Sequence, residues 1–395
     1  MSFLFLVGLS CLTLVLNTMA FMTITPVLPD LLIEWQLTES EAGLLGGAFF
    51  IGYVTAVPIL VPLTDRILPK KVYVISGIIG ALSCFGFAFM ANELFSGVFF
   101  RILTGIGVAG TYMPALKAMA DDLDEPYRTR AASFYTSTYA VGTAASILSG
   151  GIFCDLLDWR WAFIAAGVGI IAGTLIGSWA LPNGKVSDKP IKQITAFQRA
   201  FRNKAAMVNI AAYFGHLWEV FSNRVWIVSF FVMAESYQGS NFVLTAAGVA
   251  TLVALSGVPV SMWCGEAIQI FGKNKILNLI MIGSLIVGIT VAFTTSAPLW
   301  VIASLSILYG IFSYADTGPL NAITVSLAEP DVRGATMAIH ACTGFVGGIL
   351  GALAIGMTLQ ISGGFFSPEA WKYAFLVMVF GSAFGLFVRW KFKSD

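Results

Sequence analysis

The sequence consists largely of uncharged apolar runs that are too long for the core of a water-soluble domain. Twelve of them can cross the roughly 30 Å of hydrocarbon in a bilayer. They cover residues 3–28, 42–63, 72–91, 94–116, 132–153 and 160–181, and then 206–233, 243–265, 276–295, 298–322, 335–361 and 371–390. Hydrophobic residues make up 57% of the chain and charged residues 11%. We therefore expect an all-α membrane protein with 12 transmembrane helices.

The distribution of Lys and Arg predicts how these helices are oriented. With a cytoplasmic N-terminus, the inner loops and the tail hold all but four of the 22 basic residues. The exceptions are Arg101 and Arg224 inside helices, and Arg160 and Lys372 outside. Because cytoplasmic loops carry an excess of positive charge, we expect both termini in the cytoplasm and a multi-pass protein of the cell inner (plasma) membrane. The first run lacks a basic start and a cleavage site before Asp30, so we interpret it as a helix rather than a signal peptide.

The stretch from Arg101 to Pro114 occurs twice in similar form. On a helix its polar side chains share one face, while Gly107, Gly110 and Pro114 lie opposite. The pattern returns 205 residues later, where Gly310 and Pro319 match Gly105 and Pro114. This repeat predicts two homologous six-helix bundles in parallel orientation.

A polar segment, residues 182–205, separates the two repeats. Within it Ile191, Ile194, Phe197 and Phe201 recur at helical spacing, which predicts an amphipathic helix on the inner leaflet. A solvated basic linker is the alternative interpretation. The predicted domains are the N-terminal bundle 1–181, the cytoplasmic linker 182–205 and the C-terminal bundle 206–395.

Several function classes find no support in the sequence. The five Cys residues are scattered, without the spacing of a metal site, and no nucleophile motif or phosphate loop is present. The net charge of +1 gives no reason to expect nucleic acid as a partner. We therefore expect no enzyme, no cofactor and no metal.

Ionisable side chains inside apolar helices are the strongest functional signal. Each costs roughly 2.5 kcal/mol or more in hydrocarbon, so it should face a cavity or a partner. They are Arg101 in the fourth run, His216, Glu219 and Arg224 in the seventh, Asp316 in the tenth and His340 in the eleventh.

The motifs resemble those of the major facilitator superfamily (MFS) of secondary transporters, and the resemblance covers essentially the whole chain. The fourth-helix pattern is complete in Arg101, Gly105, Gly107, Gly110 and Pro114. The loop after helix two keeps Asp65, Arg66 and Lys70 but has Val61, Leu68 and Pro69 at the other motif positions. The fifth-helix pattern of drug/proton antiporters keeps Gly142, Gly150 and Gly151, with Ser146-Ile147 in place of Gly-Pro.

This resemblance implies two bundles around a central cavity lined by helices 1, 4, 7 and 10, in a protein that acts as a monomer. We expect a secondary active transporter that moves a small organic solute, preferably anionic, by alternating access with H⁺ coupling. The predicted substrate-binding residues are Arg101, Arg224, Asn17, Tyr112, Tyr213, Asn223 and Tyr309. The predicted proton-coupling residues are Glu219, Asp316, His216 and His340, and the predicted conformational latch is Asp65 with Arg66.

Structural roles and other functions remain open at this point. Arg101 could hold the fourth helix, Glu219 and His216 could form a static i,i+3 pair, and Asp316 and His340 a fixed ion pair. A proton-driven multidrug or metabolite exporter is an alternative function, weakened by the missing Gly-Pro. A non-transporting receptor on the same fold is a second alternative.

Overall fold

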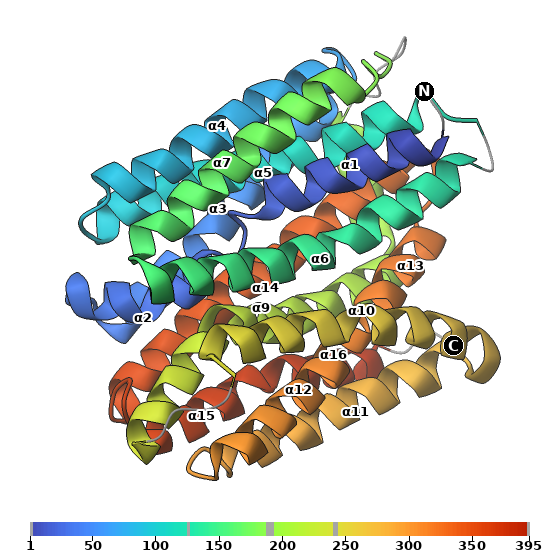
Figure 1. Cartoon of the computed structure of the whole chain (residues 1–395). Coiled ribbons are helices and arrows are strands. Elements are labelled where there is room, and N and C mark those ends of the chain that lie inside the picture. Colours follow the sequence, from blue (N-terminus) through green and yellow to red (C-terminus); the bar gives the residue numbers. More distant parts are fainter. Residues whose placement is uncertain (1–2, 125–126, 187–192, 240–243, 393–395) are drawn as a thin grey trace. The chain divides into compact units, whose positions relative to one another are not determined.

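The computed structural model describes residues 3–124, 127–186, 193–239 and 244–392, and in these ranges the chain is almost entirely helical (Figure 1). Eleven helices of the described part are long and apolar enough to span a membrane, and α1 is a shorter apolar helix. The total of twelve spans and the orientation of the termini stay predictions.

The chain forms two compact units. The first unit comprises Met1–Trp35 and Ala48–Pro190, and the second comprises Gln36–Gly47 and Ile191–Asp395. The domain boundaries predicted from the repeat stay a prediction.

The first unit is built from α1 to α7. The bounds are α1 (Phe3–Thr18), α2 (Ile24–Glu34), α3 (Glu39–Leu63), α4 (Pro69–Met90), α5 (Leu94–Ala120), α6 (Tyr127–Leu156) and α7 (Trp159–Ala180). The beginning of α3 groups with the second unit. Helices α4, α5 and α7 lie side by side (Figure 1).

The first apolar run, predicted as one helix over 3–28, is instead two helices, α1 and α2. A break inside hydrocarbon leaves backbone groups without helical partners, and each needs another one. Arg101 of α5 donates from Nη1 to the carbonyl of Ala20 (2.9 Å) and from Nη2 to that of Phe21 (3.1 Å). The hydroxyl of Ser146 on α6 accepts from the N–H of Met22 (3.2 Å). Side chains of two other helices therefore stabilise the break.

The glycines of α5 allow three helices to approach closely. A Cβ on Gly105 would lie 2.0 Å from the carbonyl oxygen of Phe49 on α3. A Cβ on Gly107 would lie 2.6 Å from the backbone of Gly80 on α4. The small-residue pattern of the fourth apolar run thus serves backbone packing, as is usual between membrane helices.

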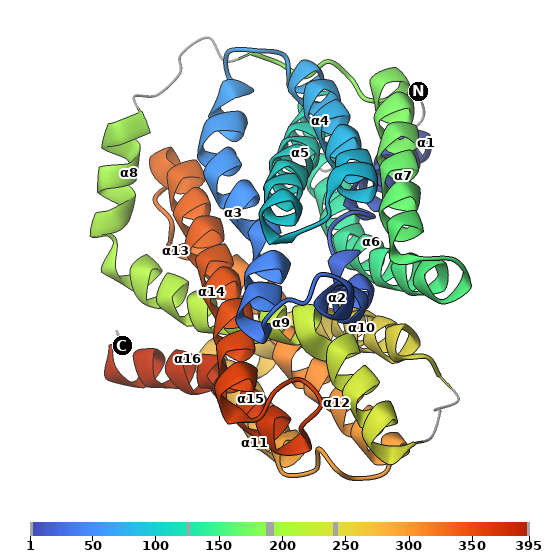
Figure 2. The ribbon, with the colours of Figure 1, turned by 90° about the vertical axis from the view of Figure 1, so that its left-hand side faces the viewer.

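The second unit contains the remaining helices. The bounds are α8 (Gln193–Arg202), α9 (Lys204–Gln238), α10 (Ala246–Phe271), α11 (Lys273–Ala292), α12 (Leu299–Ala315), α13 (Thr317–Leu327), η1 (Pro330–Val332), α14 (Arg333–Ser362), α15 (Pro368–Met378) and α16 (Phe380–Lys391). Figure 2 shows α13 and α14 side by side, and both contact α9.

Two of the predicted helices in this unit are interrupted. The run 298–322 is divided at Asp316 into α12 and α13, and the run 371–390 is divided at Val379 into α15 and α16. At the first break Pro319 has no N–H to donate to the carbonyl four residues earlier. The N–H of Gly318 donates instead to Oγ of Ser261 on α10 (3.0 Å).

A row of glycines on α14 packs against α9. A Cβ on Gly347 would lie 2.4 Å from the carbonyl oxygen of Phe214, and one on Gly351 would lie 2.7 Å from that of Trp218. The spacing of four residues places both glycines on one helix face. Because the two backbones approach so closely, side chains on this face of α9 lie near α13 and α14.

The predicted amphipathic helix of the linker is α8, although residues 191 and 192 at its predicted start lie outside the described residues. Its Ala200 is 1% exposed and packs in a cluster with Ile210 and Ile339. Arg199 forms an ion pair with Glu329 (2.6 Å). Part of the apolar face of α8 is therefore buried against protein, and its place on the inner leaflet stays a prediction.

Candidate functional site

Arg101 is buried in the first unit, and its two terminal guanidinium nitrogens hold the α1–α2 break, whereas its Nε has no hydrogen-bond partner among the described residues. Its side chain is 1% exposed, it bonds the two carbonyls described above, and its guanidinium lies 5.2 Å from the ring centre of Phe49. These contacts agree with the alternative that Arg101 has a structural role in holding helices together. Its contact with substrate stays a prediction.

Asn17 and Tyr112, the other predicted substrate contacts of the first unit, also pack between helices. Asn17 Nδ2 donates to the hydroxyl of Tyr73 on α4 (2.9 Å), and that hydroxyl donates to the carbonyl of Gly173 on α7 (2.7 Å). Tyr112 stacks on Tyr135 of α6 with ring centres 5.8 Å apart. Asn17 thereby links three helices.

The predicted latch residues behave differently from one another. Asp65 forms an ion pair with Lys117 of α5 (2.6 Å), whose ammonium also donates to the carbonyl of Thr64 (2.9 Å). Arg66 is exposed and has no ion-pair partner among the described residues. The latch geometry that the structure provides is therefore Asp65 with Lys117, a partner that the sequence did not indicate.

In the second unit, His216 and Asp316 form a buried pair. Nδ1 of His216 lies 2.8 Å from Oδ1 of Asp316, and the two side chains are 2% and 5% exposed. Nε2 of the same ring lies 3.0 Å from Oγ1 of Thr317. The expected pairing of Asp316 with His340 is thus wrong, because the break between α12 and α13 places Asp316 beside α9 instead.

His340 contacts the middle of α13. Its Nδ1 lies 2.9 Å from Oγ1 of Thr324, and its Nε2 lies 2.8 Å from Oδ1 of Asn321. The ring of Tyr213 stacks on it at 3.7 Å between centres and also lies 5.5 Å from the ring of His216. The sequence-predicted residues His216, Tyr213 and His340 therefore form one cluster.

Glu219 belongs to a separate polar cluster. Its carboxylate accepts a hydrogen bond from the hydroxyl of Ser284 on α11 (2.6 Å) and another from that of Ser382 on α16. Tyr309 of α12 is a further polar neighbour, and Glu219 itself is 2% exposed. The alternative of a static pair with His216 is wrong, because the carboxylate bonds the two serines.

Arg224 lies further along α9, between two aromatic rings. Its guanidinium carbon is 4.7 Å from the ring centre of Tyr314 on α12 and 5.5 Å from that of Phe221. The adjacent Asn223 is 1% exposed, and neither of its amide atoms has a hydrogen-bond partner among the described residues. The site thus combines a cation, aromatic faces and an unsatisfied amide.

Other buried polar groups without partners lie on the same two helices. Among the described residues these include Ser222 and Ser229 on α9 and Ser306 on α12. Buried polar groups are nearly always hydrogen-bonded, so such a concentration marks a place where water or ligand is expected. Helices α9 and α12 therefore carry several buried polar groups of the second unit that have no hydrogen-bond partner among the described residues.

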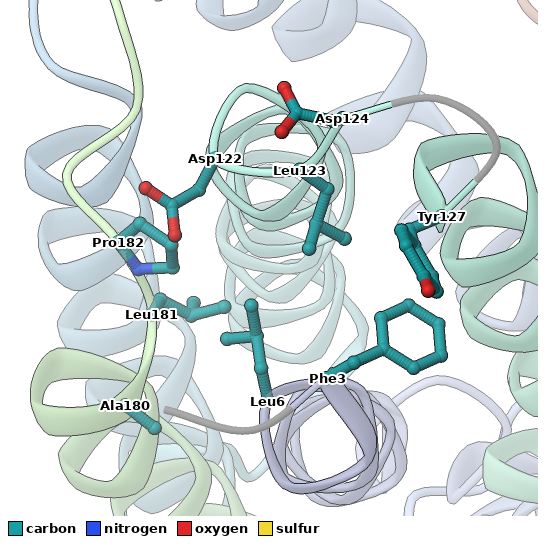
Figure 3. A pocket seen from close by; sticks show the side chains of 9 residues that line it. All are labelled: Phe3, Leu6, Asp122, Leu123, Asp124, Tyr127, Ala180, Leu181 and Pro182. Carbon is teal, nitrogen blue, oxygen red and sulfur yellow. The ribbon is translucent and has the colours of Figure 1, made fainter.

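A cavity of about 660 Å³ lies elsewhere, in the first unit at the ends of α1, α5, α6 and α7 (Figure 3). The carboxylates of Asp122 and Asp124 lie on one side of it, and the rings of Phe3 and Tyr127 lie on the other. None of the predicted site residues lines this cavity.

The uncharged members of the clusters around Glu219 and His340 were not predicted from the sequence. Ser284 and Ser382 are hydroxyls in the apolar parts of helices whose ionisable groups lie only at one end, and this isolation is the signal that could have identified them. Asn209 of α9 donates to the carbonyl of Leu320 (2.9 Å) and to the hydroxyl of Thr324 (2.8 Å). No group of three or more potential metal ligands occurs in the part of the chain that the structure describes.

A comparison with known proteins identifies the family to which this chain belongs. A family model described as Major Facilitator Superfamily matches residues 10–352. The chain belongs to the Major Facilitator Superfamily. It is therefore a multi-pass membrane protein of a transporter family, and the resemblance in its motifs is confirmed.

Two curated relatives of this superfamily member are named as transporters. The putative niacin/nicotinamide transporter NiaP of Bacillus subtilis is 22% identical over 364 residues, which are 89% of this chain and 87% of the relative. The probable sphingolipid transporter spinster homolog 1 of Arabidopsis thaliana is 23% identical over 340 residues, which are 77% of this chain and 68% of the relative.

A solved structure of similar fold is a bacterial homolog to the human lysosomal transporter Spinster. It aligns with a TM-score of 0.80 at 15% sequence identity, over 98% of this chain and 97% of that chain. At this identity the match shows the MFS fold.

Proposed function

We propose that this MFS protein is a secondary active transporter that moves a small organic anion across a bacterial plasma membrane by alternating access and couples this movement to H⁺. The observation that carries the proposal is the environment of Arg224. This cation lies in a membrane-spanning helix between two aromatic rings, next to an asparagine whose amide is unsatisfied.

An anionic substrate group would complete this environment. A guanidinium stays cationic in proteins, and its planar donors match a carboxylate bidentately. A bound carboxylate would neutralise the charge, and the amide of Asn223 would hydrogen-bond it. The name of the NiaP relative, a putative niacin/nicotinamide transporter, supports this substrate class through niacin, which carries a carboxylate, whereas nicotinamide is uncharged.

Glu219 is the group that we propose as the proton carrier. Its carboxyl group is buried with two serine hydroxyls and has no basic ion-pair partner among the described residues. When the group is ionised, both hydroxyls donate to it. When it is protonated, its own O–H can donate to one serine oxygen. The site therefore keeps hydrogen bonds in both states, as a carboxyl group that gains and loses a proton requires.

The other predicted residues take supporting roles in this proposal. Tyr213 and Tyr309 flank the buried polar clusters of the second unit, whereas Asn17, Tyr112 and Arg101 would contribute from the first unit. Asp316 with His216 forms the second proton-coupling site, and His340 lies in the same cluster. We propose that the protein is a monomer and that Asp65 and Arg66 belong to its conformational latch.

A ligand screen on the purified protein tests the substrate class. We expect carboxylates such as nicotinate to raise the melting temperature, since a ligand at 100 times its Kd stabilises the folded state by about 2.7 kcal/mol. Phosphates, amino acids and nucleosides serve as the other classes. Arg224→Gln should abolish the response to carboxylates, and the matched control Arg160→Gln, at an exposed ion pair, should retain it. Equal responses of wild type and Arg224→Gln would contradict the proposal.

A further inference from the structure

A single imidazole ring on α9, that of His216, contacts both residues at the beginning of the half-helix α13. His216 of α9 contacts the carboxylate of Asp316 through Nδ1 (2.8 Å) and the hydroxyl of Thr317 through Nε2 (3.0 Å). These two residues are the break between α12 and α13 and the first residue of α13. The protonation state of His216 on α9 thus affects the hydrogen bonds at the break between α12 and α13.

The hydrogen-bond partners determine which nitrogen of His216 carries the proton. A carboxylate only accepts, so Nδ1 of His216 must be the donor toward Asp316. In the neutral ring Nε2 then accepts from the hydroxyl of Thr317. In the protonated ring Nε2–H donates to the oxygen of that hydroxyl. Both forms keep both hydrogen bonds, and the charged form gains an ion pair with Asp316.

His340 is held in the opposite tautomer. Nδ2 of Asn321 donates to the carbonyl of Thr317 (2.9 Å), so Oδ1 of Asn321 is the atom that faces Nε2 of His340 at 2.8 Å. Nε2 must therefore carry the hydrogen, and Nδ1 accepts from the hydroxyl of Thr324 (2.9 Å). No carboxylate lies within ion-pair distance of His340 among the described residues.

The other titratable groups around this pair are few. The ring of Tyr213 on α9 stacks on both imidazoles, His340 faces His216 from α14, and Glu219 follows one turn after His216 on α9. Asp316 is in turn within electrostatic reach of Cys264 on α10 and Arg389 on α16. Because protonation of both imidazoles would place two like charges around one ring, the proton goes to the histidine with the carboxylate partner.

We propose that His216 with Asp316 is a proton-binding site that sets how firmly α13 is held to α9, and that His340 is a permanently neutral clasp that holds α13 to α14. Asn209 completes the attachment through Leu320 and Thr324. Loss of the proton weakens the grip at the helix break while the clasp remains, so α13 becomes easier to displace. The role of this site in a transport cycle rests on the proposed function, whereas the proton site itself does not.

The chain offers a direct spectroscopic test because it contains only two histidines. We would record imidazole ¹⁵N spectra of the purified protein in lipid, with His340→Gln and His216→Gln to assign the signals. We expect the neutral ring of His216 to carry its hydrogen on Nδ1, the rarer tautomer in water, and the ring to take up the second hydrogen on Nε2. We expect His340 to stay neutral as Nε2–H. Titration of His340, or a neutral Nε2–H form of His216, would overturn the proposal.

Hydrogen exchange of the backbone amides of residues 317–327 tests the consequence for α13. After correction for the intrinsic rates, protection in the wild type should rise roughly fivefold when the pH is lowered, because a charge-assisted bond to Asp316 replaces a neutral one. His216→Gln should remove this pH dependence. Thr324→Val should lower protection at every pH, and Thr324→Ser should restore it. The same pH dependence in His216→Gln as in the wild type would refute the mechanism.

Both measurements use protein without substrate, so they separate this inference from the proposed function. If the ligand screen fails while His216 behaves as described, the proton site stands and only its role in anion transport is lost. If His216 does not titrate while carboxylates stabilise the protein through Arg224, the proton site is wrong and the substrate proposal stands.

Discussion

Replacing Arg101 by Ala tests whether the α1–α2 break depends on a side chain from α5. The guanidinium donates to the carbonyls of Ala20 and Phe21 and lies over the ring of Phe49. In Arg101→Ala both carbonyls lose their side-chain donor inside the first unit. Arg101→Lys keeps the charge but cannot present two parallel donors, so it should fall between Arg101→Ala and the wild type.

The expected cost follows from these contacts. Two hydrogen bonds from a charged donor contribute about 3–6 kcal/mol, and the contact with Phe49 contributes about 0.5–2 kcal/mol. Removing a charge from hydrocarbon offsets about 2.5–3.5 kcal/mol of this. The middle values of these three ranges leave a net destabilisation of about 3 kcal/mol, which for a bundle of this size lowers the melting temperature by about 6–10 °C.

Thermal unfolding of the purified variants in detergent measures this shift. Arg160→Ala is the matched control, because Arg160 forms exposed ion pairs with Glu34 (2.9 Å) and Asp158 (3.4 Å). Exposed pairs contribute about 0–1 kcal/mol, so its shift should stay within about 2 °C. If Arg101→Ala melts within the range of Arg160→Ala, the break is held by the backbone alone and our reasoning on Arg101 fails.

Two further substitutions probe packing and charge in the first unit. Gly107→Ala should destabilise the protein by about 1–3 kcal/mol, because its Cβ would lie 2.6 Å from the Gly80 backbone. The control Gly265→Ala, whose Cβ would have nothing within 4 Å, should be neutral or stabilising. Equal melting temperatures of the two variants would contradict the close approach of α4 and α5. Partial burial, and then repulsion by Asp155, Glu34 and Asp158, raises the pKa of the Asp30 carboxyl above 3.8. The folded state therefore binds this proton more tightly than the unfolded state, and stability should fall as the pH rises from about 4 through the raised pKa. Asp30→Asn should remove this slope and melt higher than the wild type at pH 7, and a lower melting temperature there would contradict the sign.

The sequence was most informative where a property follows one helix. The period of α5 predicts its polar and small-residue faces, and the packing of Gly107 and Gly110 against α4 agrees with the small face. Buried charges likewise identify His216, Glu219 and Asp316, because their cost in hydrocarbon is independent of the partner. Gly318 and Pro319 in the tenth run are signals of a helix break that a span-length criterion overlooks.

Partner assignments could not be predicted in the same way. Helical angles place Glu219 and His216 about 60° apart but do not indicate which helices face them. The carboxylate of Glu219 bonds Ser284 and Ser382, which lie 65 and 163 residues further along the chain. Asp316 pairs with His216 rather than His340 because an interrupted helix does not continue the periodicity on which the angle depends.

Proton movement in proteoliposomes is the most direct test of the central claim, that a buried carboxyl group couples proton and anion movement. A pH-sensitive dye and a labelled carboxylate, nicotinate first, would be followed together in vesicles that contain the wild type or Glu219→Gln. We predict that the wild type moves protons with the carboxylate. Glu219→Gln should still exchange labelled for unlabelled carboxylate but should move no protons. Proton movement in Glu219→Gln equal to that of the wild type, or carboxylate movement by the wild type without protons, would contradict the account.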